Sequence, residues 1–502
     1  MHRCLDLYEV VYHIFAQLCS DQQGKATLAR LARVCTAFKD VALDHLYSNV
    51  EHFSNLLSCL PGDILQKPDW IYDEHVRFRR GMTDRDWAIL VPYAARVETL
   101  RFSFQHQESS PSEDVLRVLN ECPTGILFPK LRSLTLLQTH RLDAPLLRFL
   151  FCPQVDQLYL DGCPSRLFEE IDVPMLCPSV EHLGISNEIY DVQISSETMA
   201  QALRRWPLLK HVKCPSLAKD GLIILASLPR LRSLDIVVAN STPWVSESVD
   251  VAFHSLQSLG FIIDSPDACA SALRSLATNS SGSLTPLVVP EVTIASNLLF
   301  ADAITPLIDV TTPLSHYVAP DRLTSLHFSG SGETLIADPP FNGYAGFEPL
   351  SVFSQLRHIK IEYALVQLDF SLLSVGRSWP LLETFWLTRT NVAISLGRAM
   401  KFLAVWPRLR VFHLPVMVIM EHVEALAANT ETHKPHKCIK KMQLETPGGD
   451  ERPNVQQVAD VFARLVPRLS EVETYPDRQL YWKTVLNEMR IRCRDDETVS
   501  QA

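Results

Sequence analysis

The sequence lacks the signals of several large classes of protein. Its 502 residues contain no uninterrupted apolar stretch of about 18 residues, so no membrane-spanning helix is expected. The 12 cysteines form no CxxC pair and no tight cluster, which is ordinary for a reduced intracellular protein and sparse for a disulfide framework. Residues 1–9 include acidic side chains where a signal peptide would have an apolar run. We therefore expect a cytoplasmic or nuclear protein.

Positive charge is also in short supply. The chain has 47 Lys and Arg against 57 Asp and Glu, a formal net charge of -10. Nucleic acid and anionic membranes need a basic face, so neither is expected as the main partner. Hydrophobic residues make up 47% and charged residues 21% of the chain, a globular composition. The length suits several ordinary domains or one long repeat array.

Catalytic motifs are missing as well. There is no HExxH, GxSxG, GxGxxG or P-loop, and the glycines of residues 24–27 and 330–333 lack the neighbours of a phosphate-binding loop. Residues 433–438 (His-Lys-Pro-His-Lys-Cys) offer three zinc ligands without a fourth at standard spacing, and their lysines repel a cation. A basic, exposed loop is expected there. The sequence thus predicts no enzyme, no cofactor and no metal site.

What the chain does contain is a short apolar motif that recurs after residue 90. It places apolar residues at i, i+3 and i+5, and successive copies begin 22 to 34 residues apart. The first residues of the clear copies are Leu131, Val155, Val180, Leu209, Leu231, Leu256, Leu323, Leu356, Leu382, Leu409 and Ile439, and those of the weaker copies are Val97, Val289 and Leu469. Side chains at i+3 and i+5 of a strand point to the same side, so they are expected in a core.

A proline marks the start of many copies. It stands two residues before the first apolar position in eight of them, after a bulky or apolar residue such as Trp206, Trp379 or Trp406. Proline fixes φ, donates no hydrogen bond and favours an extended predecessor, which suits the start of a strand. The tryptophans are expected to pack there rather than bind a ligand. Segments such as residues 199–206 and 396–404 have helical periodicity between the strands.

This arrangement resembles the leucine-rich-repeat family over roughly residues 90–490. The resemblance implies an α/β solenoid with a concave parallel sheet and outer helices, in which each strand–helix unit buries its apolar face against its neighbours. We expect about 13–14 repeats over residues 91–490. The Asn or Cys that the family carries downstream of the motif is mostly absent, so irregular repeats are expected.

The N-terminal residues have a different periodicity. Apolar residues at Leu7, Val10, Val11, Ile14, Phe15 and Leu18 form a helical stripe, and a second stripe consists of Leu28, Leu31, Val34, Cys35 and Phe38. A third short helix is expected to end near Tyr47. Three short helices make too small a core to be stable alone. A partner or the adjoining repeats should therefore cover the apolar face.

Residues 5–18 resemble the start of an F-box, and residues 28–39 resemble its second half, with an apolar-x-x-Val-Cys-x-x-Phe core from Leu31 to Phe38. Tyr8 replaces the proline that the family usually has before the acidic residue, here Glu9, which weakens the expected binding. Residues 46–50, 56–61 and 82–87 also resemble a fungal class of F-box proteins with irregular repeats. The expected organisation is an F-box-like module (1–48), a helical linker or cap (49–90), the solenoid (91–490) and a polar tail (491–502).

In that family the F-box docks on the adaptor Skp1, which joins a cullin-based ubiquitin ligase, and the repeats hold the client protein. The resemblance implies that the adaptor-facing residues include Leu7, Val10, Val11, Ile14, Phe15, Leu31, Val34 and Phe38. The alternative is an interaction scaffold in which these side chains are only the core of a helical cap. The stripe alone does not separate the two.

Client binding is expected on the concave face, to which strand positions i+2, i+4 and i+6 point. The candidate residues are Tyr159, Lys213, His327, His358, Lys360 and Trp386. Trp386 with Lys360 and His358 is the most suggestive group, because aromatic and cationic anchors carry much of the energy of interfaces. The alternative is that a local loop covers Trp386.

Overall fold

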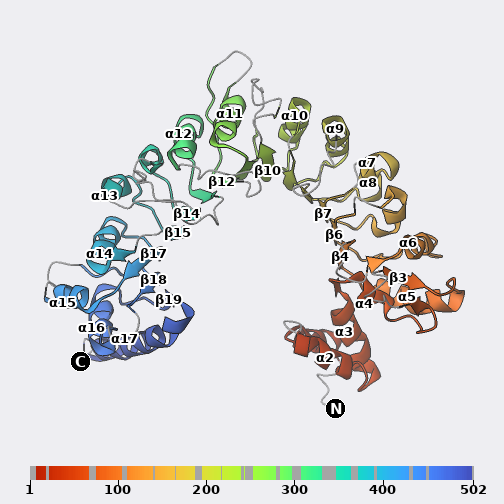
Figure 1. The fold of residues 1–502 in the computed structure, drawn as a ribbon, viewed down its shortest axis with the longest axis horizontal. Coiled ribbons are helices and arrows are strands. Elements are labelled where there is room, and N and C mark those ends of the chain that lie inside the picture. The colour runs from red at the N-terminus through yellow and green to blue at the C-terminus, as the bar shows by residue number, and fades with distance from the viewer. Residues whose placement is uncertain are drawn as a thin grey trace. The chain divides into compact units, whose positions relative to one another are not determined.

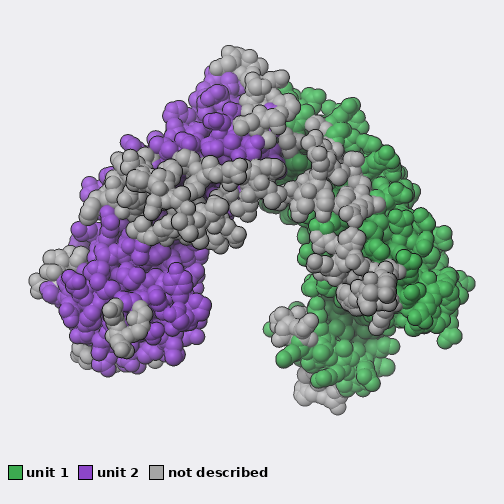
Figure 2. Space-filling model, in the orientation of Figure 1, with its two compact units in different colours: residues 1–232 green, residues 233–502 purple. Residues whose placement is uncertain are grey.

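The chain folds into two compact units. The computed structural model describes residues 7–18, 22–66, 75–104, 110–139, 142–163, 166–186, 195–215, 217–238, 242, 253–278, 283–296, 307–330, 346–362, 371–388, 393–428, 434–447 and 452–499. Its elements are shown in Figure 1. Unit 1 comprises residues 1–232 and unit 2 residues 233–502 (Figure 2). Among the described residues, no helix is long and apolar enough to cross a membrane.

Unit 1 begins with the predicted small helical module. Its helices are α1 (Tyr8–Ala16), α2 (Gln22–Leu31) and α3 (Thr36–Tyr47). Their common core consists of Val11, Phe15, Leu28, Val41 and Ala42. Phe38 closes one edge of this core, since its ring meets that of Phe15 edge to face at 5.4 Å.

The segment after the module, expected as a helical linker or cap, contains strands as well as helices. Its elements are β1 (Asn49–Val50), α4 (Phe53–Leu57), β2 (Leu65–Gln66), β3 (His75–Phe78) and α5 (Asp84–Ala94). β2 pairs antiparallel with β3, and β3 pairs in parallel with β5 (Ser110–Pro111). β1 pairs with β4 (Thr99–Ser103), so the main sheet of unit 1 starts directly after the helical module.

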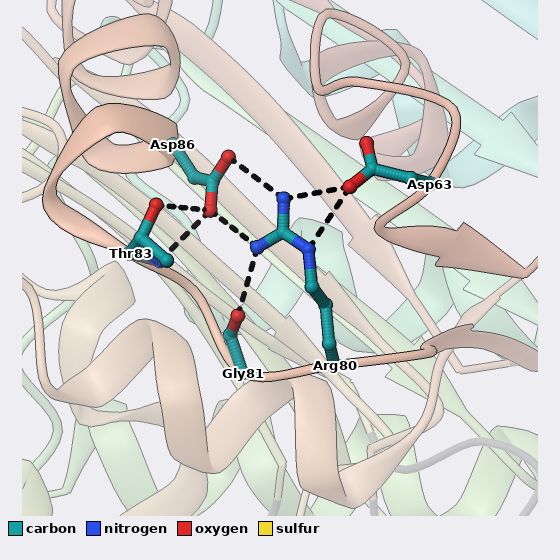
Figure 3. Close-up of polar contacts among 5 residues, drawn as sticks. All are labelled: Asp63, Arg80, Gly81, Thr83 and Asp86. Carbon is teal, nitrogen blue, oxygen red and sulfur yellow. Dashed lines mark hydrogen bonds and ion pairs between the residues drawn. The ribbon is translucent and has the colours of Figure 1, made fainter.

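An ion-pair network fixes the start of α5. Thr83 and Asp86 form a capping box, and the Arg80 guanidinium bridges Asp86 at 2.6 Å and Asp63 at 2.9 Å (Figure 3). Hydrogen bonds from Arg80 and Thr83 lower the pKa of the Asp86 carboxyl. Asp86 is only 2% exposed, so these partners are what allow a carboxylate to remain charged there. The segment that the sequence compares with fungal F-box proteins (residues 82–87) is therefore a helix start held by charge.

Parallel strands form the main sheet of unit 1 in the order β1-β4-β6-β7-β8-β9. The strands after β4 are β6 (Ser133–Leu137), β7 (Gln157–Asp161), β8 (His182–Ser186) and β9 (His211–Cys214). The connecting helices are α6 (Glu113–Asn120), η2 (Ala144–Leu150), α7 (Leu167–Glu170), α8 (Val173–Leu176), α9 (Ser196–Arg204) and α10 (Lys219–Ser227). In Figure 1 the helices α6, α7, α9 and α10 lie on one side of the strands.

Unit 2 repeats this plan, with its strands ordered β10-β11-β12-β13-β14-β15-β17-β18-β19. They are β10 (Ser233–Val238), β11 (Ser258–Ile263), β12 (Glu291–Ser296), β13 (Ser325–Ser329), β14 (His358–Glu362), β15 (Thr384–Thr388), β17 (Val411–Met417), β18 (Lys441–Glu445) and β19 (Glu471–Glu473), and β16 (Ile394–Ser395) pairs with β17. The helices are α11 (Pro266–Ala277), α12 (Leu307–Tyr317), η5 (Glu348–Val352), α13 (Ser371–Gly376), α14 (Leu396–Val405), α15 (Met420–Ala428), α16 (Val455–Leu465), η8 (Pro476–Arg478) and α17 (Gln479–Val499).

The end of unit 2 is covered by α17. Its side chains Trp482, Val485 and Met489 are buried, and the ring of Trp482 meets that of Phe462 on α16 at 5.9 Å. The helix continues to Val499, so residues 491–499, expected in a polar tail, extend it. An apolar helix face thus closes the core that the last repeat would otherwise leave open.

The predicted strand register is confirmed in both units. The apolar residues at i+3 and i+5 are the buried second and fourth positions of the repeat strands, as Leu158 and Leu160 show in β7 and Phe385 and Leu387 in β15. The weak last copy is an exception, since Val472 in the three-residue strand β19 is half-buried. The first, third and fifth positions point to the other face, away from the helices, which we call the open face of each unit. Residues at the same position of neighbouring strands lie opposite each other, so their side chains form rows that run across the sheet. This is the leucine-rich-repeat solenoid architecture that the sequence predicts.

The residue at the start of a strand also ties one repeat to the previous one. Trp206 Nε1 donates to the Cys177 carbonyl at 2.8 Å, Trp379 Nε1 to Leu350 at 3.0 Å and Trp406 Nε1 to Gly376 at 2.9 Å. His436 takes the same place in the next repeat, where its Nε2 donates to the Trp406 carbonyl at 2.8 Å. His436 is buried, although the sequence placed it in an exposed loop. The tryptophans therefore serve packing, as expected, and also bind neighbouring repeats together.

Candidate protein-binding surfaces

The predicted adaptor-facing residues fall into three groups by burial. Leu7, Ile14 and Val34 are exposed, at 56%, 48% and 63% of their surface. Val11 and Phe15 lie inside the core of the module. Val10, Leu31 and Phe38 are half-buried between these groups.

Helix geometry explains this division. A helix turns about 100° per residue, so Leu7, Val10 and Ile14 follow one flank of α1, and Val11 and Phe15 follow the adjacent flank. The second flank faces α2 and α3 and forms the core. The first flank, with Val34 from the turn after α2, leaves apolar side chains facing outward. We call Leu7, Ile14 and Val34 the exposed apolar set.

Tyr8, which stands at the position where F-box proteins have proline, joins the module to the repeats. Its hydroxyl donates to Asp44 Oδ2 on α3 at 2.6 Å. The Arg96 guanidinium, just after α5, binds the other oxygen of Asp44 and, at 2.8 Å, Asp40 Oδ1. Partial burial and the hydrogen bond to Asp44 raise the pKa of the Tyr8 phenol. Tyr8, Asp44 and Arg96 thus connect α1 to the beginning of the sheet.

Two further contacts make this junction continuous. The Ser48 carbonyl, at the end of α3, accepts hydrogen bonds from the backbone N–H of Glu98 at 2.9 Å and of Thr99 at 2.8 Å. The rings of Tyr47 on α3 and Tyr93 on α5 have centroids 4.9 Å apart. The module is therefore part of the compact body of unit 1.

On the open face of unit 1, Tyr159 lies across Gly184 of the next strand. A Cβ built on Gly184 would overlap Tyr159 Cδ2, so the ring occupies the space that a side chain would take. Lys213 follows Gly184 in the same row. The exposed His182 and His211 stack beside this row, with ring centroids 4.4 Å apart, and partial burial and the charge of His182 lower the pKa of His211. Tyr159 and Lys213, both predicted client residues, thus share one row.

The open face of unit 2 is centred on Trp386. The Trp386 ring stacks on that of His413, with centroids 3.8 Å apart and planes at 14°. Lys360 Nζ lies 5.9 Å and Lys441 Nζ 5.5 Å from the centroid of the indole, within the range of cation–π interactions. His413 is almost fully buried, and Trp386 is half-buried.

Carboxylates surround this aromatic pair. Glu473 Oε1 lies 3.1 Å from His413 Nε2, and its Oε2 lies 3.2 Å from Lys441 Nζ, which also pairs with Glu471 at 2.7 Å. Burial alone would raise the pKa of Glu473, but the neighbouring His413 and Lys441 outweigh it and lower the pKa. We call Lys360, Trp386, His413, Lys441 and Glu473 the Trp386 cluster.

Of the other predicted client residues, His327 is joined to this cluster and His358 is not. His327 lies 3.6 Å from Glu362, whose other oxygen pairs with Lys360 at 2.9 Å. Burial and the charge of Lys360 lower the pKa of His327. His358 is the first residue of β14, in a different row from Lys360, and it hydrogen-bonds with Thr384 at 3.1 Å. The structure therefore brings Lys360 and Trp386 together, with His327 as a neighbour.

Three residues of the cluster were missing from the sequence-based selection. His413 is position i+4 of the Leu409 repeat, Lys441 is i+2 of the Ile439 repeat and Glu473 is i+4 of the Leu469 repeat. The register that selected Trp386 would have found all three. Among the described residues, no group of three or more His, Cys, Asp or Glu side chains could hold a metal ion.

Comparison with known proteins shows similarity in fold alone. No family model matches the sequence, and no curated protein is detectably similar to it. Among solved structures, the chain is similar to an internalin from Listeria monocytogenes (14% identity, 71% of this chain and 88% of that chain, TM-score 0.35). It is also similar to a leucine-rich-repeat protein of Leptospira interrogans (12%, 77% and 98%, 0.29) and to the yeast Rad7–Elc1 complex (14%, 73% and 84%, 0.35). The fold assignment depends on the repeat geometry described above.

Proposed function

We propose that this chain is the substrate-recognition subunit of a Skp1–cullin–F-box ubiquitin ligase in the cytoplasm or nucleus. Its helical module docks an adaptor of the Skp1 type, and the open faces of its repeats bind a client protein. The chain itself performs no catalysis, because the other subunits of such a ligase supply the chemistry.

The exposed apolar set carries this proposal. Val11, Phe15 and Leu28 already give the module a core. Leu7, Ile14 and Val34 are not needed for that core and remain largely exposed. Exposed apolar side chains on a small module are typical of an interaction site. Residues of a purely structural cap would be expected to turn inward.

The second candidate function is an interaction scaffold in which the module only caps the repeats. Two observations favour it: the hydrogen-bonded connection from Tyr8 through Asp44 to Arg96, and the pairing of β1 with β4 immediately after α3. Both describe a module built into the repeat array. They are compatible with adaptor docking as well, since they involve α3 and the start of the sheet rather than Ile14 or Val34.

A binding measurement with a purified Skp1-type adaptor separates the two functions. We expect the full chain to bind it, and Ile14→Asp or Val34→Asp to weaken binding at least about tenfold, because a charge would be buried in an apolar interface. The matched control is Leu480→Asp, since Leu480 is 77% exposed on α17 and outside the module. Circular dichroism confirms that each variant is folded.

Two outcomes would reject the ligase role: no adaptor binding by the wild-type chain, or equal binding by wild type and Ile14→Asp. The scaffold would then be the remaining function. Phe15→Asp is unsuitable for this test, because Phe15 belongs to the core and its loss would unfold the module.

A further inference from the structure

The open faces of the two units differ in charge. The outward strand positions of unit 2 carry two lysines, Lys360 and Lys441, and six carboxylates: Asp235, Glu291, Glu362, Glu445, Glu471 and Glu473. With the histidines neutral, the formal charge of these positions is -4. Arg478 neutralises Glu445 at 3.0 Å, which leaves an excess of three carboxylates. The equivalent positions of the unit 1 sheet hold Arg101, Lys213 and one carboxylate, Asp161.

The lysines on this face of unit 2 are already paired. Lys360 is bound by Glu362 at 2.9 Å, and Lys441 by Glu471 at 2.7 Å and Glu473 at 3.2 Å. Two carboxylates therefore share the single charge of Lys441. One of the three surplus carboxylates therefore lies at β19, beside the stacked rings of Trp386 and His413, and the other two, Asp235 and Glu291, lie on β10 and β12. An incoming cation would be attracted to this end of the face.

Buried polar atoms without hydrogen-bond partners lie on the strands around this aromatic pair. In the described part of the chain they include Trp386 Nε1 on β15 and Gln443 Oε1 on β18. Gln443 pairs in register with Glu473, whose carboxylate is already bound by His413 and Lys441. A buried polar atom left unpaired is costly, and a ligand that pairs with it gains that free energy. The Gln443 side-chain oxygen needs a donor, and the indole N–H needs an acceptor.

We propose that the open face of unit 2 binds an extended basic segment of a partner protein. Its cationic side chains lie against the Trp386–His413 pair and donate to Gln443 and Glu473, and a backbone carbonyl accepts from Trp386 Nε1. Arginine fits best, because its guanidinium is flat, stacks on aromatic rings and has five N–H donors. This inference rests on the proposed function, since it describes the client that the repeats hold.

The width of the sheet from Lys360 on β14 to Glu473 on β19 matches the length of a short peptide. From β14 to β19 the sheet contains four neighbouring pairs of strands. At about 4.8 Å for each pair, this is about 19 Å. An extended chain advances about 3.3 Å per residue, so about six residues span this width. Alternate side chains of such a segment point to the same side and can all face the sheet.

The test uses the full chain and a fluorescein-labelled peptide of about eight residues in which serine and arginine alternate. Two matched peptides carry glutamine or glutamate in place of arginine. Fluorescence anisotropy is measured in about 50 mM NaCl, where charges are weakly screened. We expect the arginine peptide to bind at least about tenfold more tightly than the glutamine peptide, and the glutamate peptide to bind more weakly still.

Two variants locate the site. Glu473→Gln preserves shape and is expected to weaken binding of the arginine peptide about three- to fivefold, and Trp386→Leu about five- to tenfold. The matched control is Asp161→Asn, which removes an outward carboxylate from the open face of unit 1 and should leave binding unchanged. Since glutamine has nearly the same shape as glutamate, the result for Glu473→Gln does not depend on how well the Trp386 variant folds.

Two results would overturn the inference. One is binding of the glutamate peptide as tightly as the arginine peptide. The other is an equal loss for Glu473→Gln and Asp161→Asn, which would reveal unspecific attraction to an acidic chain. Ile14→Asp separates this inference from the proposed function, because it changes the adaptor site and leaves the open face of unit 2 unchanged. Peptide binding without adaptor binding would reject the ligase role alone, and adaptor binding without peptide binding would reject this inference alone.

Discussion

The indole of Trp386 stacks on the imidazole of His413, the side chain in the same row of the neighbouring strand, with 3.8 Å between ring centroids. This pair joins β15 to β17 at the last position at which the two strands pair, and the pairing of β17 with β18 becomes irregular directly after Phe412. The stack therefore serves two purposes. It stabilises the sheet where its register changes, and it presents a half-buried aromatic surface on the open face.

Removing His413 should destabilise unit 2. His413→Ala leaves a gap against the Trp386 ring and removes a buried partner of Glu473. We expect the free energy of unfolding to fall by about 1–3 kcal/mol, measured by urea titration with tryptophan fluorescence. The matched control is His358→Ala, since His358 is exposed and its side chain has, among the described residues, one hydrogen bond, to Thr384. Equal effects of the two variants would show that the stack contributes no stability.

Asp86 should make the start of the repeat array sensitive to acid. Its pKa is lowered in the folded chain, chiefly by the hydrogen bond from Arg80. The resulting stability is present above the unfolded-state pKa, about 3.9, and is lost as the pH falls towards the lower folded-state value. Asp86→Asn should therefore lower the urea midpoint at neutral pH, and the difference from wild type should shrink below about pH 4.

Asp84→Asn is the control for that experiment, because Asp84 lies in the same first turn of α5 and is exposed. It changes the chain by the same single charge without touching the Arg80 network. We expect it to leave the pH dependence of the midpoint as in wild type. A difference between wild type and Asp86→Asn that stays constant from neutral pH to about pH 3 would contradict the assignment.

The solenoid architecture could be predicted from the sequence because its signal is repeated many times. Each copy places the same apolar residues at the same positions, and the prolines fix where a strand begins. The register then predicts which side chains point outward, Trp386 among them. It also predicts His413, because the rule is the same for every strand.

Contacts between distant side chains could not be predicted in this way. The stripe on α1 spans more than one flank of the helix, and periodicity does not say which flank faces α2 and α3. The partner of Tyr8, Asp44, is 36 residues away and depends on how the helices pack. The place of His436 is hidden for another reason: the lysines at 434 and 437 suggest an exposed segment, and only the alignment of repeats shows that His436 replaces a tryptophan.

Tyr8→Phe should separate the stability of the module from its docking surface. The variant loses the hydrogen bond to Asp44 and leaves Leu7, Ile14 and Val34 unchanged. We expect the free energy of unfolding to fall by about 0.5–1.5 kcal/mol, with faster hydrogen exchange in α1. Adaptor affinity should stay within about twofold of wild type, since a phenyl ring still fills the site. A loss of affinity as large as that of Ile14→Asp would place Tyr8 in the docking surface itself.

Gly184 should be intolerant of even a methyl group, because the Tyr159 ring lies over it. Gly184→Ala forces that ring to move, and we expect a loss of about 1–3 kcal/mol, measured as a lowered thermal midpoint. The matched variant is Gly397→Ala in α14, where a Cβ would meet nothing within 4 Å. There the substitution should stabilise the chain by about 0.5–1 kcal/mol, because alanine favours helix. Effects of the same sign and size at both positions would mean that the Tyr159 ring does not rest on Gly184 in solution.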